Sequence, residues 1–194
     1  MSRPSVSCLL IIVFIASGCS SSYDADQAKA RQQRLMLSDA QDAYHQDRAT
    51  AALVLARRLV TEYPDFARGY LLKAKIERKL KMDEQAIETL DKAIALDKSL
   101  AEAHLDRGIC LRSLDRLGES ELAIDNAREL LLKRLESGLP LALTRLNLAM
   151  IAHLQGNSRS ALDQVELILT SEPDLESAVE LKKAILSDTS ASDR

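Results

Sequence analysis

Apolar residues recur along most of the chain at the spacing of amphipathic helices. Such stretches cover residues 51–62, 84–96, 122–138 and 161–171. In the clearest of them, residues 84–96, the apolar side chains that share one helical face are Ala86, Ile87, Leu90, Ala93, Ile94 and Leu96. This pattern predicts an all-α protein built from short helices.

The composition supports helices and limits the material of the core. Hydrophobic residues make up 46% of the 194 residues, but aromatic residues only 3%, so Leu, Ile, Val and Ala must form the core. Six Gly and four Pro are too few for the many turns of a β-sandwich or barrel. The net charge of −3, with 28% charged residues, provides no concentrated basic surface of the kind that nucleic-acid binding needs.

The helical stretches repeat with a period of 34 residues. Four units can be aligned, and seven residues (135–141) interrupt the period before the last one; the units are 33–66, 67–100, 101–134 and 142–175. Small residues recur at the eighth place of each unit, namely Ala40, Ala74, Gly108 and Ala149. They recur again at the twentieth place, as Ala52, Ala86, Ser120 and Ala161. Small side chains at both places would let two helices approach closely.

Together with Pro64 and Pro173 near the ends of two units, this pattern resembles the tetratricopeptide repeat. The resemblance implies an α-solenoid of about four helical hairpins over residues 33–186, in which 176–186 form a capping helix with a polar outer face. The bulky aromatic residue of the repeat is present as Tyr70 in the second unit but is missing elsewhere. A non-repetitive helical bundle is therefore the alternative.

The N-terminus has the features of a secretory signal. Arg3 precedes an apolar stretch of about ten residues (6–15), which is too short for a bilayer that needs about 20 and suits a signal peptide. Small residues (16–18, ASG) then precede Cys19, and this arrangement resembles the lipobox of bacterial lipoproteins. A plain secretory signal and a transmembrane anchor are the alternatives.

The lipobox resemblance implies a processed and anchored protein. Residues 1–18 would be the signal peptide, Cys19 would carry the lipid, including an acyl group such as palmitate, and 19–32 would be a polar tether. Ser20, rather than Asp, follows the cysteine, which resembles sorting to the outer membrane and implies a location on its periplasmic face. Residues 187–194 are expected to form a flexible tail.

The sequence contains no motif that predicts catalysis. It has no HExxH, CxxC, Walker or GxGxxG pattern, and its three histidines, His45, His104 and His153, lie far apart. Cys110 is the only cysteine besides Cys8, in the signal, and Cys19, so the processed chain cannot form an internal disulfide. We therefore expect that the protein is not an enzyme and that it binds neither a cofactor nor a metal ion.

A binding surface follows from the repeat resemblance. In tetratricopeptide arrays, the first helices of the hairpins line a concave face that binds a peptide or helix of another protein. The positions that correspond to this groove are Leu37, Tyr44, Leu71, Lys75, Arg78, Leu105, Ile109, Arg112, Leu146, Met150 and His153, with Gln41, Arg68 and Leu143 beside them. Core packing is the alternative for the apolar residues, and plain solvent exposure is the alternative for the basic ones.

These features predict a scaffold that binds a client protein and is anchored in the membrane by its N-terminal lipid. By analogy of architecture, the leading hypothesis is an assembly or localisation factor for a pilus or secretion machine. The alternative is an adaptor that recruits cell-wall hydrolases or proteases in envelope maintenance. An exposed apolar end of the array would also allow a homodimer.

Overall fold

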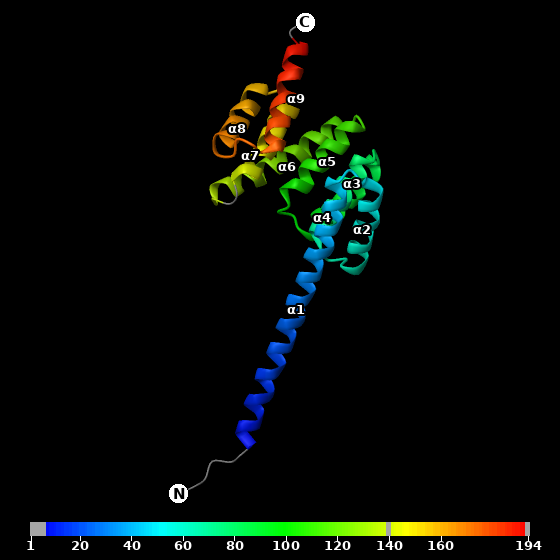
Figure 1. Ribbon diagram of the computed structural model, residues 1–194, viewed down its shortest axis with the longest axis vertical. Coiled ribbons are helices and arrows are strands. Elements are labelled where there is room, and N and C mark those ends of the chain that lie inside the picture. Colours follow the sequence, from blue (N-terminus) through cyan, green and yellow to red (C-terminus); the bar gives the residue numbers. More distant parts are fainter. Residues whose placement is uncertain (1–6, 139–140, 193–194) are drawn as a thin grey trace.

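The computed structural model describes residues 7–138 and 141–192, with side chains for 23–138 and 142–189. This part of the chain is all-α and contains no strand. Its helices follow one another as antiparallel hairpins stacked side by side (Figure 1). Their bounds are α1 Ser7–His45, α2 Ala49–Glu62, α3 Ala67–Lys79, α4 Asp83–Leu96, α5 Ala101–Ser113, α6 Leu117–Glu136, α7 Leu141–Leu154, α8 Ser158–Ser171 and α9 Glu176–Ser192.

The same turn joins the two helices of every hairpin. One residue in it adopts a left-handed backbone conformation, with φ of 59°, 62°, 59° and 76° at Asp47, Lys81, Asp115 and Gly156. Its N–H donates to the carbonyl three residues back, and the next N–H donates to the carbonyl five residues back, as in a Schellman motif. These turns are 34, 34 and 41 residues apart, so each lies at the fifteenth place of a predicted unit.

The small residues at the eighth and twentieth places all lie buried between helices. In the third hairpin the contact is direct, because the Ser120 hydroxyl donates a 2.8 Å hydrogen bond to the carbonyl of Gly108. A Cβ atom on Gly108 would lie 2.6 Å from Ile124 Cγ1 and 3.2 Å from the Ser120 carbonyl oxygen. The close approach of α5 and α6 therefore requires glycine at this position.

The core consists of four clusters in series along the array. Each cluster joins the helices of one hairpin to the first helix of the next hairpin. At the end of the array, α9 takes the place of a further first helix, because it buries Ala178 and Ile185 against the last hairpin. In the described part of the chain, each hairpin contacts only the hairpins next to it, and α9 contacts only the last hairpin. This is the packing expected of a helical solenoid, so the predicted fold class is confirmed.

The N-terminal part of α1 extends away from the array (Figure 1). The predicted tether, 19–32, lies within this helix, and its side chains from Tyr23 onward are exposed except for the half-buried Ala30. The predicted signal peptide, 1–18, and the lipidation residue Cys19 lie outside the residues whose side chains are described. Within the described residues, no helix combines the length and the apolar character that crossing a membrane demands.

The seven-residue interruption lengthens helices instead of forming a loop. The α6 helix has 20 residues, whereas α2, α4 and α8 have 14 each. It ends before Gly138, whose φ is +72°, and α7 begins at Leu141. At the C-terminus, α9 continues to Ser192, so most of the predicted tail, 187–194, is helical; there the Thr189 hydroxyl donates to the Ile185 carbonyl at 3.2 Å.

Candidate protein-binding groove

A groove of about 830 Å³ opens on the face formed by the first helices of the hairpins. It is bounded by α1, α3, the start of α5, the end of α6 and the start of α7. Its volume lies within the range of about 300–1,000 Å³ that is typical of ligand sites. The apolar side chains that line it are Leu37, Leu71, Leu72, Leu100, Leu130 and Leu143.

Two helices each present one face to the groove. On α3, the lining residues Arg68, Leu71, Leu72 and Lys75 lie three, four and seven positions after the first, which is the spacing of one helical face. On α6, Leu130, Lys133 and Arg134 follow the same rule near the end of the helix. Each face therefore combines a leucine surface with basic side chains.

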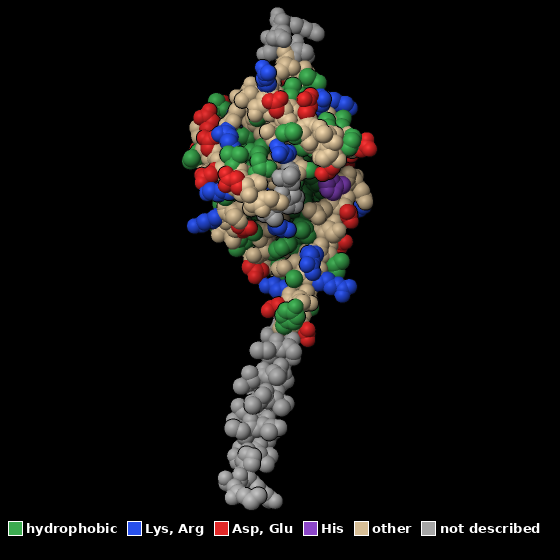
Figure 2. All heavy atoms as spheres, turned by 90° about the vertical axis from the view of Figure 1, so that its left-hand side faces the viewer, with side chains coloured by type: hydrophobic (Ala, Val, Ile, Leu, Met, Phe, Trp, Pro, Cys, Tyr) green, Lys and Arg blue, Asp and Glu red, His purple; other side chains and the backbone are tan. Residues whose placement is uncertain are grey.

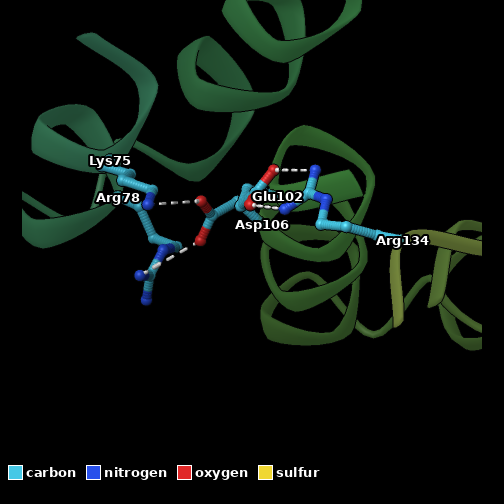
Figure 3. Close-up of polar contacts among 5 residues, drawn as sticks. All are labelled: Lys75, Arg78, Glu102, Asp106 and Arg134. Atoms are coloured by element: carbon cyan, nitrogen blue, oxygen red, sulfur yellow. Dashed lines mark hydrogen bonds and ion pairs between the residues drawn. The ribbon is translucent and has the colours of Figure 1, made fainter. Parts of the chain in front are cut away.

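Asp106 of α5 lies buried between two basic residues of α3. Its carboxylate is 3.3 Å from Arg78 Nη2 and 3.8 Å from Lys75 Nζ (Figure 3), and the residue is only 6% exposed. Burial raises the pKa of Asp106 above its usual range, while the positive charges of Lys75 and Arg78 oppose that shift. These contacts tie α3 to α5 behind the groove.

Glu102, one turn before Asp106, makes the corresponding contact with α6. Arg134 donates two hydrogen bonds to its carboxylate oxygens, at 2.5 and 3.3 Å (Figure 3). Burial acts to raise the pKa of Glu102, but the hydrogen bonds and the charge of Arg134 outweigh burial and hold the pKa below its usual value. This bidentate pair fixes the end of α6 against α5.

Arg68 is the lining cation that is most available to a partner. It is exposed, and it forms no ion pair within the described part of the chain, whereas Lys133 pairs with Glu129 at 2.6 Å. The pKa of Asp97 is lowered mainly by a hydrogen bond from Ser99, and the charges of Arg68 and Arg134 lower it further. The lining of the groove therefore includes one exposed cation without an ion pair among the described residues.

Some predicted groove residues do line this groove. Leu37, Leu71 and Lys75 do so, together with the neighbouring Gln41, Arg68 and Leu143. Arg78 lies behind the groove in its ion pair with Asp106. Tyr44 packs half-buried against the first core cluster, with Lys79 Nζ 4.7 Å from its ring centroid.

The remaining predicted positions lie elsewhere. Leu105 is 3% exposed and belongs to the third core cluster, so it is not a groove residue, and Ile109 packs against the same cluster. Leu146 packs against the fourth cluster, where Met150 is half-buried on the same helix. The last two positions are also outside the groove: Arg112 lines a separate cavity of about 390 Å³, and His153 Nε2 lies 3.2 Å from Asp188 of α9.

Three groove residues on α6 and the acidic pair on α5 were not predicted. Leu130, Lys133 and Arg134 belong to a second helix of a hairpin, and the repeat resemblance directs attention to first helices. The signal that could have revealed them is the apolar and basic run at the end of an unusually long helical stretch. For Glu102 and Asp106, the available signal was their spacing of four residues, which places both carboxylates on one face of α5.

The potentially reactive side chains do not converge. No group of three His, Cys, Asp or Glu in the described residues is arranged to hold a metal ion. Cys110 is fully buried, and burial, with a contribution from Asp83, raises the pKa of its thiol to about 12. Burial also lowers the pKa of His104, whose Nε2 lies 3.3 Å from the Lys98 carbonyl.

The sequence itself matches no protein-family model and no curated protein. The structure is similar to that of a tetratricopeptide-repeat protein of Thermus thermophilus, with 23% identity, a TM-score of 0.57 and coverage of 78% of this chain and 80% of that one. It is also similar to the second tetratricopeptide domain of Spaghetti (RPAP3) bound to an HSP90 peptide, with 21% identity, a TM-score of 0.52 and coverage of 55% and 98%.

A third similar structure is that of SycD, the type III secretion translocator chaperone of Yersinia enterocolitica. The two sequences are 16% identical, the TM-score is 0.51, and the match covers 72% of this chain and 93% of that one. These likenesses show the fold: the described chain is a tetratricopeptide-like α-solenoid.

Proposed function

We propose that this protein is a scaffold that binds a segment of a client protein in the groove between α1, α3, α5, α6 and α7. The observation that carries the proposal is the groove itself, which combines leucine side chains with four basic side chains, two of them exposed, on a helical framework. A surface of this kind suits binding better than catalysis, because it brings no nucleophile or general base together with a stabilising group. The similar RPAP3 domain, bound to an HSP90 peptide, supports a peptide or helix as the ligand.

The scaffold is proposed to act at a membrane. The apolar stretch 6–15, the small residues 16–18 and Cys19 support lipidation at Cys19, and Ser20 supports sorting to the outer membrane, with the array on its periplasmic face. Because acyl chains contribute about 0.8 kcal/mol for each buried methylene, several chains on one residue would hold the protein firmly.

Within the envelope, the proposed role is assembly or localisation of a pilus or secretion machine. The argument is one of architecture, since SycD, a chaperone of a secretion translocator, has a similar fold. The competing role is recruitment of cell-wall hydrolases or proteases. The identity of the client would decide between these roles.

The test is photo-crosslinking in cells from two matched positions. A photoreactive amino acid replaces Leu71, which lines the groove, or Val54 of α2, which is 67% exposed and does not line the groove. Capture of a pilus or secretion component from Leu71, and not from Val54, would support the proposal. Capture of wall enzymes would favour the adaptor role, capture of a second copy would identify a dimer interface, and equal products from both positions would refute the groove as the client site.

Anchoring is tested separately with Cys19→Ser. We expect this variant to leave the membrane fraction and to lose the mass of the lipid, both of which can be measured by fractionation and intact-mass spectrometry. Unchanged mass and membrane association would rule out lipidation at this residue.

A further inference from the structure

The charged side chains that line the groove are mostly basic, and three of the four basic ones form ion pairs with carboxylates of the same protein. Four of the charged side chains that line it are basic, and Glu102 is the one acidic side chain among these described lining residues. The complete chain has a net charge of −3, and acidic and basic side chains are interspersed over the face shown in Figure 2. Arg68, which forms no ion pair in the described part of the chain, and the loosely paired Lys75 lie beside apolar side chains, which points to a partner that carries negative charge beside its own apolar residues.

The basic side chains on α3 have a defined spacing. Arg68 and Lys75 are seven residues apart on one helical face, which corresponds to about 10 Å along the helix axis. The half-buried Leu71 lies between them on the same face, beside Leu72, which is 6% exposed and belongs to the first core cluster. The complementary surface is therefore a short apolar segment with carboxylates near both ends, about two helical turns apart.

Both of these cations can accept a new partner. Arg68 forms no ion pair in the described part of the chain. Lys75 is 36% exposed and lies 3.8 Å from Asp106, which is the longest ion-pair distance among the described residues, and Asp106 keeps its closer contact with Arg78. A carboxylate from a partner could therefore approach Lys75 without leaving Asp106 unpaired.

Helices α6 and α7 form the other side of the groove. Leu130 and Arg134 line it from α6, and Leu143 of α7, which is 53% exposed, adds an accessible apolar side chain. Since Arg134 donates two hydrogen bonds to Glu102, the α6 side of the groove is fixed against α5.

We infer that the occupant of the groove is an acidic amphipathic helix of at least about two turns, with its apolar face on Leu71 and its carboxylates on Arg68 and Lys75. This inference rests on the proposed function, because it takes the groove as the client site. It adds the chemistry by which the client is recognised.

The test uses two synthetic helical peptides of about fifteen residues with leucines on one face. One carries two glutamates seven positions apart beside the leucines, and the other carries lysines at the same two positions. Binding to the full-length protein in a nonionic detergent is measured by fluorescence anisotropy. The wild type is expected to bind the glutamate peptide at least about tenfold more tightly than the lysine peptide, and salt should weaken that preference.

Arg68→Glu is the test variant, and Arg57→Glu is its control. Arg57 is also exposed and forms no described ion pair, but it lies on α2 and does not line the groove. We expect Arg68→Glu to weaken binding of the glutamate peptide about tenfold and to strengthen binding of the lysine peptide, while Arg57→Glu changes neither. Equal effects of the two variants, or equal binding of the two peptides to the wild type, would overturn the inference.

The two proposals can fail independently. If photo-crosslinking from Leu71 captures a client but the glutamate peptide does not bind, the groove is a client site with a different chemistry, and only the inference about acidic helices is lost. If the peptide shows no preference and Leu71 captures no more than Val54 does, the proposed function is lost as well.

Discussion

Gly108→Ala tests how closely α5 and α6 approach. The added methyl would lie 2.6 Å from Ile124 Cγ1 and 3.2 Å from the Ser120 carbonyl oxygen. Ile124 is 1% exposed and belongs to the third core cluster, so a movement of its side chain would disturb the packing of that cluster. Overpacking of this kind costs about 1–3 kcal/mol, and replacing a helical glycine by alanine returns about 1 kcal/mol. The expected net loss in the free energy of unfolding is therefore up to about 2 kcal/mol.

Gly118→Ala is the matched control. Gly118 lies in α6, and a Cβ atom added to it has no neighbour within 4 Å. Only the helix-propensity effect remains there, so the variant should gain up to about 1 kcal/mol of stability. Gly69→Ala should fall between the two, because its Cβ atom would lie 3.2–3.3 Å from side-chain atoms of Phe66 and Leu59.

The assay is urea unfolding of the three variants followed by far-ultraviolet circular dichroism. The difference between Gly108→Ala and Gly118→Ala isolates the steric cost and should be about 1–3 kcal/mol. Equal changes in the two variants would refute the argument that the close contact of α5 and α6 requires glycine at position 108.

Three further predictions concern single residues. Lys81→Gly should raise the free energy of unfolding by up to about 1 kcal/mol, because a left-handed conformation costs a side chain roughly 1–2 kcal/mol; a lower urea midpoint would contradict this. In a variant without the other cysteines, Cys110 should react with thiol reagents only after unfolding, since it is buried with a pKa of about 12; rapid labelling of the native protein would contradict this. Glu102→Gln should lower stability at neutral pH and reduce the loss of stability as the pH falls below 4.5. The reason is that the pKa of Glu102 beside Arg134 is lower in the folded than in the unfolded protein, so its contribution to stability is complete above the unfolded-state pKa and is lost as the pH falls through the folded-state pKa. Parallel pH profiles of the two proteins would contradict this.

The helical hairpins could be predicted because their constraint is local and repeated. Two helices that touch at the eighth and twentieth places need small side chains there, so the sequence shows Ala, Gly or Ser at both places in every unit. The direct bond from Ser120 to the Gly108 carbonyl is the clearest example of this contact. The left-handed turn residue was harder to recognise, because only Gly156 is a glycine, and Asp47, Lys81 and Asp115 adopt the same conformation.

The distinction between groove and core could not be predicted from periodicity. Leu37, Leu71, Leu105 and Leu146 all occupy the fifth place of a unit. The first two line the groove, whereas Leu105 is buried in the third core cluster and Leu146 packs against the fourth. A helical period identifies one face of a helix, but both a neighbouring hairpin and a partner protein can cover that face.

The greater length of α6 accompanies the different environments of equivalent positions. Leu131, in the part of α6 that exceeds the length of the other second helices, belongs to the same core cluster as Leu105. The same extension carries Lys133 and Arg134, which line the groove. Residues 131–136, by which α6 exceeds the other second helices, thus include Leu131 in the core cluster of Leu105 and Lys133 and Arg134 in the lining of the groove. If the groove binds a client as proposed, variants of Leu130, Lys133 or Arg134 should change client binding, whereas variants of the repeated small residues should lower the stability of the array.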